Sequence, residues 1–179
     1  MNLILSKPQV ITDIVAEPVA TTKLKEWMKI SFNDDDLLIT DLSKAARQML
    51  ESYTGLSFGV KTLSVQMEID CDMVRLPYGP LQSVTGIVLH NGFGNNETLA
   101  AGSDYEVFGN LVHLNRLGIM TITYTGGFID LQEDLIGDIK RLVAWMYQNR
   151  GIQFETGDEI KKYPDWQALA ANRYIERVV

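Results

Sequence analysis

The hydrophobic period of the chain changes twice, and this constrains the fold more than any other feature. Up to Gly55, apolar residues recur at the spacing of amphipathic helices. From about residue 58 they alternate with polar residues, as in a half-buried strand. The clearest alternating run contains Leu63, Val65, Met67 and Ile69. Helical spacing returns after Gly126-Gly127. The sequence therefore predicts an α+β chain in which a strand-rich block separates two helical blocks.

Two long amphipathic helices are expected, over about residues 34–54 and 132–149. Asn33 is the expected N-cap of the first helix, and Gly55 is expected to end it. The carboxylates of Asp34 to Asp36 would lie in its first turn, where the positive end of the helix dipole stabilises negative charge. Its predicted buried stripe is Leu38, Leu42, Ala45, Met49 and Tyr53, widened by Leu37, Ala46 and Leu50. The predicted stripe of the second helix is Leu135, Ile139, Leu142 and Met146.

Shorter elements follow from local signals. Thr21 or Thr22 can cap a short helix that ends near Ile30, and Asp130 with Glu133 has the spacing of a capping box. Pro164 can start a last helix. Asn91-Gly92 and Gly109-Asn110 are turn dipeptides that predict two β-hairpins.

The expected architecture is two long antiparallel helices plus short ones, with an antiparallel β unit of five or six strands inserted between the long helices. We expect a single domain. Its parts are an N-terminal arm (1–20), a helical segment (21–56), the β unit (58–127), a helix (130–151) and a C-terminal arm (152–179).

Composition narrows the function. The chain has 179 residues, with 16 basic and 23 acidic side chains and a net charge of −7. Such acidity disfavours tight binding to phosphate backbones. Cys71 is the only cysteine, which excludes an internal disulfide and multi-cysteine metal sites. We find neither a membrane-spanning apolar run nor a signal peptide.

Signals for catalysis are weak. Asp34, Asp35 and Asp36 are the one acidic run, and a metal-binding module or enzyme built on them is an alternative reading. Their consecutive placement at a helix start differs from an EF-hand loop, so capping is the favoured interpretation. His90 and His113 lack nearby ligand partners in sequence, and no nucleophile elbow or phosphate-binding loop is present. We expect no catalytic residue, metal or cofactor.

Several segments, taken in order, resemble one protein family. The first two are L-K-E-W-M-K-I and N-D-D-D-L-L-I-T-D-L-S-K-A-A-R-Q-M-L-E-S-Y-T-G, which contain Ala45-Ala46-Arg47 and Tyr53-Thr54-Gly55. The later ones are R-L-P-Y-G-P-L-Q-S-V (75–84), I-T-Y-T-G-G-F (122–128) and W-M-Y-Q-N-R (145–150). Over about residues 22–151 the chain resembles head–tail connector proteins of tailed bacteriophages, specifically the β-containing "DNA packaging protein" branch of the HK97-type family.

This resemblance implies a structural adaptor and no enzyme. Such adaptors form a ring, usually a dodecamer, beneath the portal of the capsid. They extend the DNA channel and join the capsid to a stopper or tail-completion protein. The resemblance places the chain in the neck of the virion, assembled in the host bacterial cytoplasm. Packaged DNA would pass through the lumen without specific binding, and no membrane is involved.

Contact surfaces are expected at the loop 77–82 and the arm 152–179, the latter by analogy facing the portal. The candidate interface residues are Arg75, Pro77, Tyr78, Gly79, Pro80, Arg150, Tyr163, Trp166, Arg173 and Tyr174. A second alternative keeps the phage setting: a tail-completion or stopper-like neck protein that does not contact the portal.

Overall fold

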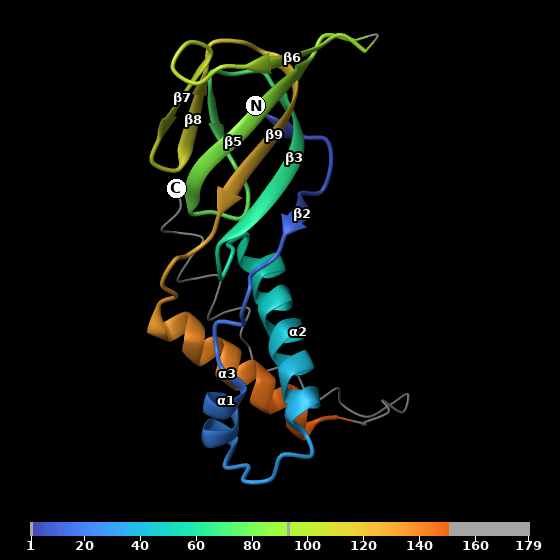
Figure 1. Cartoon of the computed structure of the whole chain (residues 1–179), viewed down its shortest axis with the longest axis vertical. Helices are drawn as coiled ribbons and strands as arrows, with labels where there is room; N and C mark the ends of the chain where they lie inside the picture. Colours follow the sequence, from blue (N-terminus) through green and yellow to red (C-terminus); the bar gives the residue numbers. More distant parts are fainter. Residues whose placement is uncertain (1, 93, 151–179) are drawn as a thin grey trace, which may run out of the picture. The chain divides into compact units, whose positions relative to one another are not determined.

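The chain folds into two compact units in the computed structural model, which describes residues 2–92 and 94–150 (Figure 1). The first, here called the β unit, combines Met1–Val15 with Gly55–Ile129. The second, the helical unit, combines Ala16–Thr54 with Asp130–Val179. Each unit is therefore assembled from segments that are distant in the sequence.

The helical unit contains α1 (Thr21–Met28), α2 (Asp36–Thr54) and α3 (Glu133–Gln148). α3 crosses α2 obliquely, and α1 contacts both (Figure 1). Apolar side chains from all three helices are buried between them, where their removal from water stabilises the unit. They are Leu24, Ile39, Ala46, Leu50, Leu135, Ile139, Leu142 and Val143. No helix within the described residues is long and apolar enough to span a membrane.

A six-stranded antiparallel sheet forms the larger part of the β unit. Its order is β1-β3-β9-β5-β6, and β2 also pairs with β3. The bounds are β1 Leu3–Ile4, β2 Gln9–Thr12, β3 Lys61–Ile69, β5 Leu81–His90, β6 Asn96–Leu99 and β9 Gly118–Gly126. β3 and β9 pair without a break from Lys61 opposite Gly126 to Ile69 opposite Gly118. These two strands therefore form the centre of the unit.

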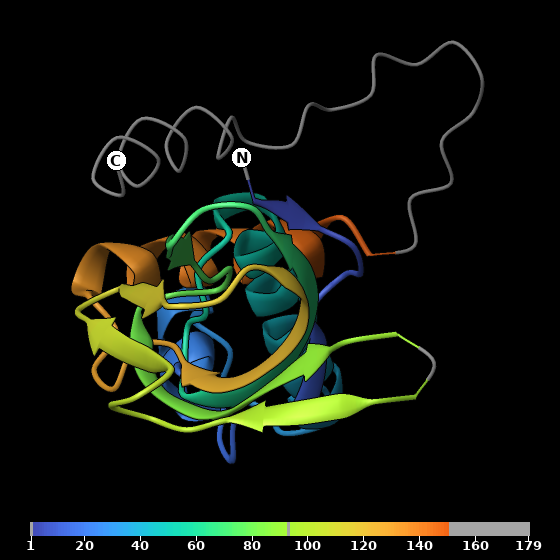
Figure 2. The ribbon, with the colours of Figure 1, turned by 90° about the horizontal axis from the view of Figure 1, so that it is seen from above.

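A three-stranded sheet, β4-β8-β7, completes the unit (Figure 2). It consists of β4 (Met73–Arg75), β7 (Tyr105–Phe108) and β8 (Leu111–Leu114). One apolar core is shared by the two sheets, with Val74, Val112 and Leu114 from the small sheet and Met120, Ile122 and Tyr124 from β9. Both predicted hairpins are confirmed, because β5–β6 and β7–β8 pair across their turns and Gly92 and Gly109 have positive φ.

The predicted architecture of two long antiparallel helices plus short helices, with an antiparallel β unit of about five or six strands inserted between them, is wrong. Among the described residues there are three helices, of at most 19 residues, and nine strands in two antiparallel sheets. The N-terminal strands β1 and β2 were missed because all their side chains are exposed, so they show no alternation of apolar and polar residues. The bounds of β6 were not predicted, because Leu99 is its one apolar side chain and leaves no alternation to follow.

Three details of the predicted helices are also wrong. The N-cap of α1 is Ala20 and that of α3 is Gln132, and neither cap has a side-chain hydrogen bond. α2 begins at Asp36, and the Asp36 N–H donates to the Asn33 carbonyl at 3.1 Å. Asn33 therefore contributes through its backbone to the turn that leads into α2.

The predicted stripe of α2 is only partly its buried face: Ala46 and Leu50 are buried, whereas Leu37 is exposed. The buried residues are Ile39, Ser43, Ala46, Arg47, Leu50 and Glu51. Leu38, Leu42, Ala45, Met49 and Tyr53 are only half-buried. Both sets have helical spacing, so periodicity alone could not decide which one faces α3.

Candidate interaction surfaces

The turn from Pro77 to Pro80, predicted as a contact loop, has a defined shape. Tyr78 has φ 55°, a left-handed conformation that is rare for a bulky side chain. The Tyr124 phenol donates to the Pro77 carbonyl at 2.5 Å, and the Gly127 N–H donates to the Pro80 carbonyl at 2.8 Å. The turn is thus attached to strand β9 and to the segment that follows it, which keeps Tyr78 and Gly79 in place beside β5.

The Tyr124 phenol is fully buried. Its burial raises its pKa, and the nearby Tyr78 phenol raises it further. The hydroxyl therefore stays protonated and continues to donate to Pro77 at every pH near neutrality. This bond links the contact loop to the core of the β unit.

Arg75 lies on the outer side of the three-stranded sheet. The register places Arg75 opposite Leu111 and Leu111 opposite Phe108. The next row along the same face contains Met73, His113 and Glu106. Val74 and Val112 point the other way and are fully buried. We call these six outward residues the β4–β8–β7 face: Met73, Arg75, Glu106, Phe108, Leu111 and His113.

This face combines exposed apolar groups with free charges. Phe108 is 55% exposed and Met73 is 40% exposed. Arg75 and Glu106 are exposed and have no ion-pair partner among the described residues. His113 lies 3.6 Å from the carboxylate of Asp72. Aromatic residues and arginine are enriched where protein interfaces gain most of their binding energy.

A second apolar surface runs along the N-terminal arm. Its side chains are 43–59% exposed: Leu3, Ile4, Leu5, Val10 and Ile11. They belong to β1, β2 and the link between them, at the edge of the six-stranded sheet. We call this set the arm edge. The sequence indicated only an arm over residues 1–20, because short exposed strands leave no periodic signal.

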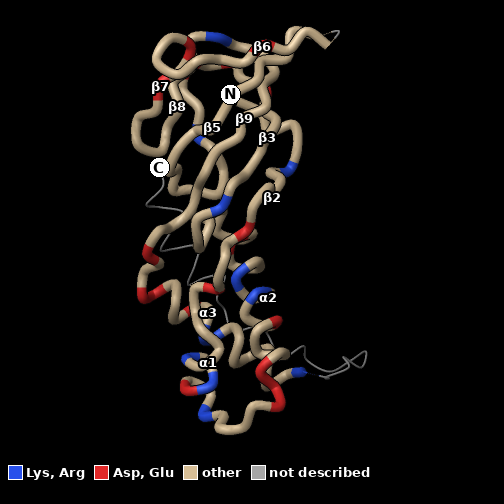
Figure 3. Tube along the Cα trace, viewed as in Figure 1, with Lys and Arg blue, Asp and Glu red and all other residues tan. Residues whose placement is uncertain are grey.

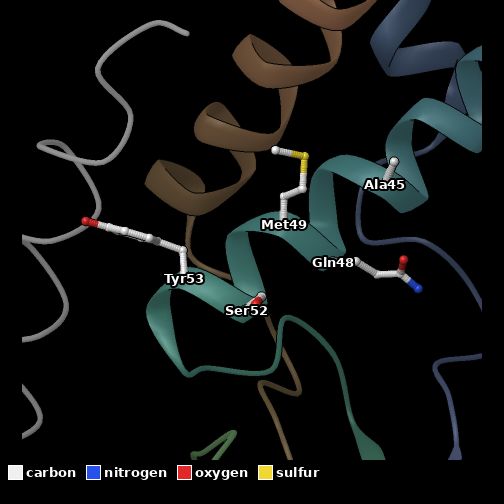
Figure 4. A pocket seen from close by; sticks show the side chains of 5 residues that line it. All are labelled: Ala45, Gln48, Met49, Ser52 and Tyr53. Atoms are coloured by element: carbon white, nitrogen blue, oxygen red, sulfur yellow. The ribbon is translucent and has the colours of Figure 1, made fainter.

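An open groove of 520 Å³ lies along α2 (Figure 4). Its lining is half-buried (Ala45, Met49 and Tyr53) or exposed (Gln48 and Ser52). Three residues that we expected in the core, Ala45, Met49 and Tyr53, thus line this surface groove.

The C-terminal end of α3 is held by Asp35. Its carboxylate accepts hydrogen bonds from the Tyr147 hydroxyl and, at 3.1 Å, from Arg150. The Arg150 guanidinium also stacks 4.0 Å from the centre of the Tyr147 ring. Arg150, a predicted interface residue, therefore has partners within its own unit. The other candidates Tyr163, Trp166, Arg173 and Tyr174 lie outside the described residues.

The acidic run has cationic partners. Asp36 pairs with Lys25 at 2.7 Å, and Asp35 with Arg150. Across residues 2–92 and 94–150, no group of three or more histidine, cysteine or acidic side chains is arranged to hold a metal ion. The metal-site alternative gains no support from this part of the chain.

Arg47 was not predicted to be buried, yet its side chain is 1% exposed. It donates to Glu17 at 2.8 Å and to Glu51 at 3.1 Å. The Arg47–Glu51 spacing of four residues was visible in the sequence, but the distant Glu17 was not. The cluster joins the segment before α1 to α2 and so has a structural role.

Solvent-exposed apolar residues on an edge strand and on a sheet face are typical of a protein that contacts other chains. Residues 21–105 match the family model of the Phage gp6-like head-tail connector protein. This match agrees with the resemblance found in the sequence: over these residues the chain is similar to phage head–tail connector proteins.

Solved structures with a similar fold come from gene transfer agent (GTA) particles. A chain of the "virion of native gene transfer agent (GTA) particle" has a TM-score of 0.74 and 17% identity over 94% of this chain and 95% of that one. A chain of the "neck of empty GTA particle computed with C6 symmetry" has a TM-score of 0.73, 18% identity and the same coverages. No curated protein sequence matches the chain significantly.

Proposed function

We propose that the protein forms a ring, of twelve copies in the expected case, beneath the portal of a phage-like particle and joins the portal to a stopper or tail-completion protein. It does so without catalysing a reaction. The loop 77–82 and the arm 152–179 are the proposed contact segments. The ring extends the channel through which packaged DNA passes.

The match of residues 21–105 to the connector family carries this proposal. That range includes α1 and α2 of the helical unit and the strands β3 to β6 of the β unit. The similarity therefore covers parts of both units, including the loop 77–82 proposed for contacts.

Charge pairing supports passage of DNA without specific binding. Figure 3 shows basic residues interspersed with acidic ones along the chain. Lys25, Arg116 and Arg141 each lie within 3.0 Å of a carboxylate oxygen. A chain with net charge −7, in which these three basic side chains are paired with carboxylates, offers little attraction for phosphates.

Native mass spectrometry of the protein mixed with the portal ring of the same particle tests the proposal. We expect a complex with one copy per portal subunit. Deletion of residues 152–179 should abolish this complex while leaving the far-ultraviolet circular dichroism of the described fold. As a control, Arg116→Ala, on the surface of the β unit, should leave the complex intact.

Two results would contradict the proposal. If folded protein and folded portal form no complex, and cross-links in intact particles reach only tail proteins, the chain is a tail-side neck protein. If the truncated chain binds the portal as well as the full chain, the arm is not the docking segment.

A further inference from the structure

The arm edge exposes more apolar surface than a free edge strand normally does. Its five side chains are 43–59% exposed, and Val15 after it is fully exposed. Natural proteins protect edge strands with charges, prolines or a covering chain. Here Lys7 and Pro8 separate β1 from β2, but the strands themselves are aliphatic. A surface of this kind is typically covered by another protein in the functional assembly.

The β4–β8–β7 face is a second such surface on the same unit. Its apolar part is Met73, Leu111 and Phe108, and its central strand β8 is paired on both sides, with β4 and with β7. A partner would therefore bind through side chains and not by adding a strand to β8. Aliphatic side chains such as those of the arm edge can pack against the Phe108 ring and the Met73 thioether.

The β2 part of the arm edge and the β4–β8–β7 face lie on opposite sides of the β unit (Figure 1), whereas Asn2, just before β1, donates to the Met73 carbonyl of β4. In Figure 1, β7 and β8 lie on the left of this unit and β2 on the right. A closed ring of identical chains needs two different surfaces on each copy, so that one surface of each copy meets the other surface of the next. The arm edge and the β4–β8–β7 face meet this requirement.

The charges on the two surfaces are complementary. The arm side carries Glu68, which lies opposite Leu3 in the sheet, and Lys7. The β4–β8–β7 face carries Arg75 and Glu106. All four are exposed and lack ion-pair partners among the described residues. Each surface thus carries one acidic and one basic side chain. Opposite charges can therefore meet when two copies touch, and their positions fix how the copies are oriented.

We propose that the arm edge of one copy packs against the β4–β8–β7 face of a second copy of this chain, with Glu68 of one copy facing Arg75 of the next. The inference rests on the proposed ring and names the surfaces that hold neighbouring copies together. Apolar side chains form the centre of this contact and the charged residues form its rim.

Cross-linking between copies tests the contact directly. Cys71, which is exposed, is first replaced in Cys71→Ser. Leu3→Cys and Phe108→Cys are then made as separate single-cysteine chains, mixed, assembled on the portal and treated with a short bismaleimide. We expect a dimer that contains one chain of each kind. Thr98→Cys, exposed on β6, is the matched control and should give no such dimer with Leu3→Cys.

Charge reversal gives an independent test. Glu68→Arg and Arg75→Glu each place like charges in the contact, so each should weaken association between copies by about tenfold. The double variant restores the pair with its signs exchanged and should recover most of the loss. Lys44→Glu, an exposed reversal on α2, should have no such effect.

The outcomes separate this inference from the proposed function. A ring that forms on the portal, but gives no Leu3–Phe108 cross-link and does not respond to the reversals, overturns the contact and leaves the connector ring standing. Cross-links from these cysteines only to the portal or a tail protein overturn it as well. A chain that forms no ring, alone or on the portal, overturns both proposals.

Discussion

Tyr124 on strand β9 donates its phenolic hydrogen bond to the carbonyl oxygen of Pro77, 47 residues earlier in the chain, at 2.5 Å. This bond connects the most buried aromatic residue of the β unit with the loop proposed for contacts. The shape of the loop therefore depends on a core residue, and its disturbance should be measurable as a change in stability.

Tyr124→Phe tests this connection. The variant leaves the Pro77 carbonyl without its donor and should lower the free energy of unfolding by about 1–2 kcal/mol at neutral pH. Urea unfolding followed by tryptophan fluorescence measures the change. Tyr53→Phe, a half-buried tyrosine of the helical unit, is the control for the loss of a hydroxyl outside the β unit.

The same phenol should make stability depend on alkaline pH. Its pKa in the folded chain is raised, chiefly by burial, whereas an unfolded tyrosine ionises near pH ~10. The neutral phenol is thus favoured by folding, so this stability is complete below pH ~10 and falls at higher pH, by up to about 1.4 kcal/mol per unit. The free energy of unfolding of Tyr124→Phe should therefore fall less steeply than that of the original protein between about pH 9 and about pH 11. Equal slopes for the two proteins would contradict this assignment.

Gly127→Ala should disrupt the β unit. Gly127 has φ +121°, and a Cβ there would lie 2.0 Å from the Gly59 carbonyl oxygen. Both backbone strain and this clash oppose the substitution, so we expect a loss of at least about 2 kcal/mol in thermal or urea unfolding. Gly86→Ala is the matched control, since nothing lies within 4 Å of the position that a Cβ would take there, and should change stability by less than about 1 kcal/mol.

Arg47→Ala should strongly destabilise the helical unit. The substitution leaves Glu51, whose side chain is 5% exposed, without its buried partner. Removal of one member of a buried ion pair costs about 3–5 kcal/mol. The double variant Arg47→Met with Glu51→Leu removes the two most buried charges, leaves the more exposed Glu17, and should recover much of that loss in denaturant unfolding. Lys44→Ala, exposed on the same helix, should stay within about 0.5 kcal/mol of the original protein.

Asp35→Ala should loosen the last turn of α3. It removes the acceptor for Tyr147 and Arg150, and a partly exposed pair of this kind contributes up to about 1 kcal/mol. Hydrogen exchange of the α3 C-terminus should therefore become roughly fivefold faster. Asp34→Ala, which is exposed, is the control. Unchanged exchange in Asp35→Ala would show that these bonds do not hold the end of the helix.

The sequence by itself determined the features that rest on neighbouring residues. Gly109 and Asn110 sit between two apolar runs, and the turn they form needs positive φ at glycine, so the β7–β8 hairpin was predictable. The alternation from Leu63 to Ile69 likewise predicted β3, because a strand with one buried face has period two.

Only the tertiary structure decided which surfaces are buried. α2 has two stripes at helical spacing, and packing against α3 selected Ile39, Ala46 and Leu50 over Leu42 and Met49. The arm edge became strands solely because β3 offered a free edge for backbone pairing, which needs no side-chain pattern. Arg47 reaches Glu17 across 30 residues, and burial of that pair depends on the surrounding helices. Local sequence patterns therefore determine where helices and strands form, whereas contacts between distant residues determine which of their faces are buried.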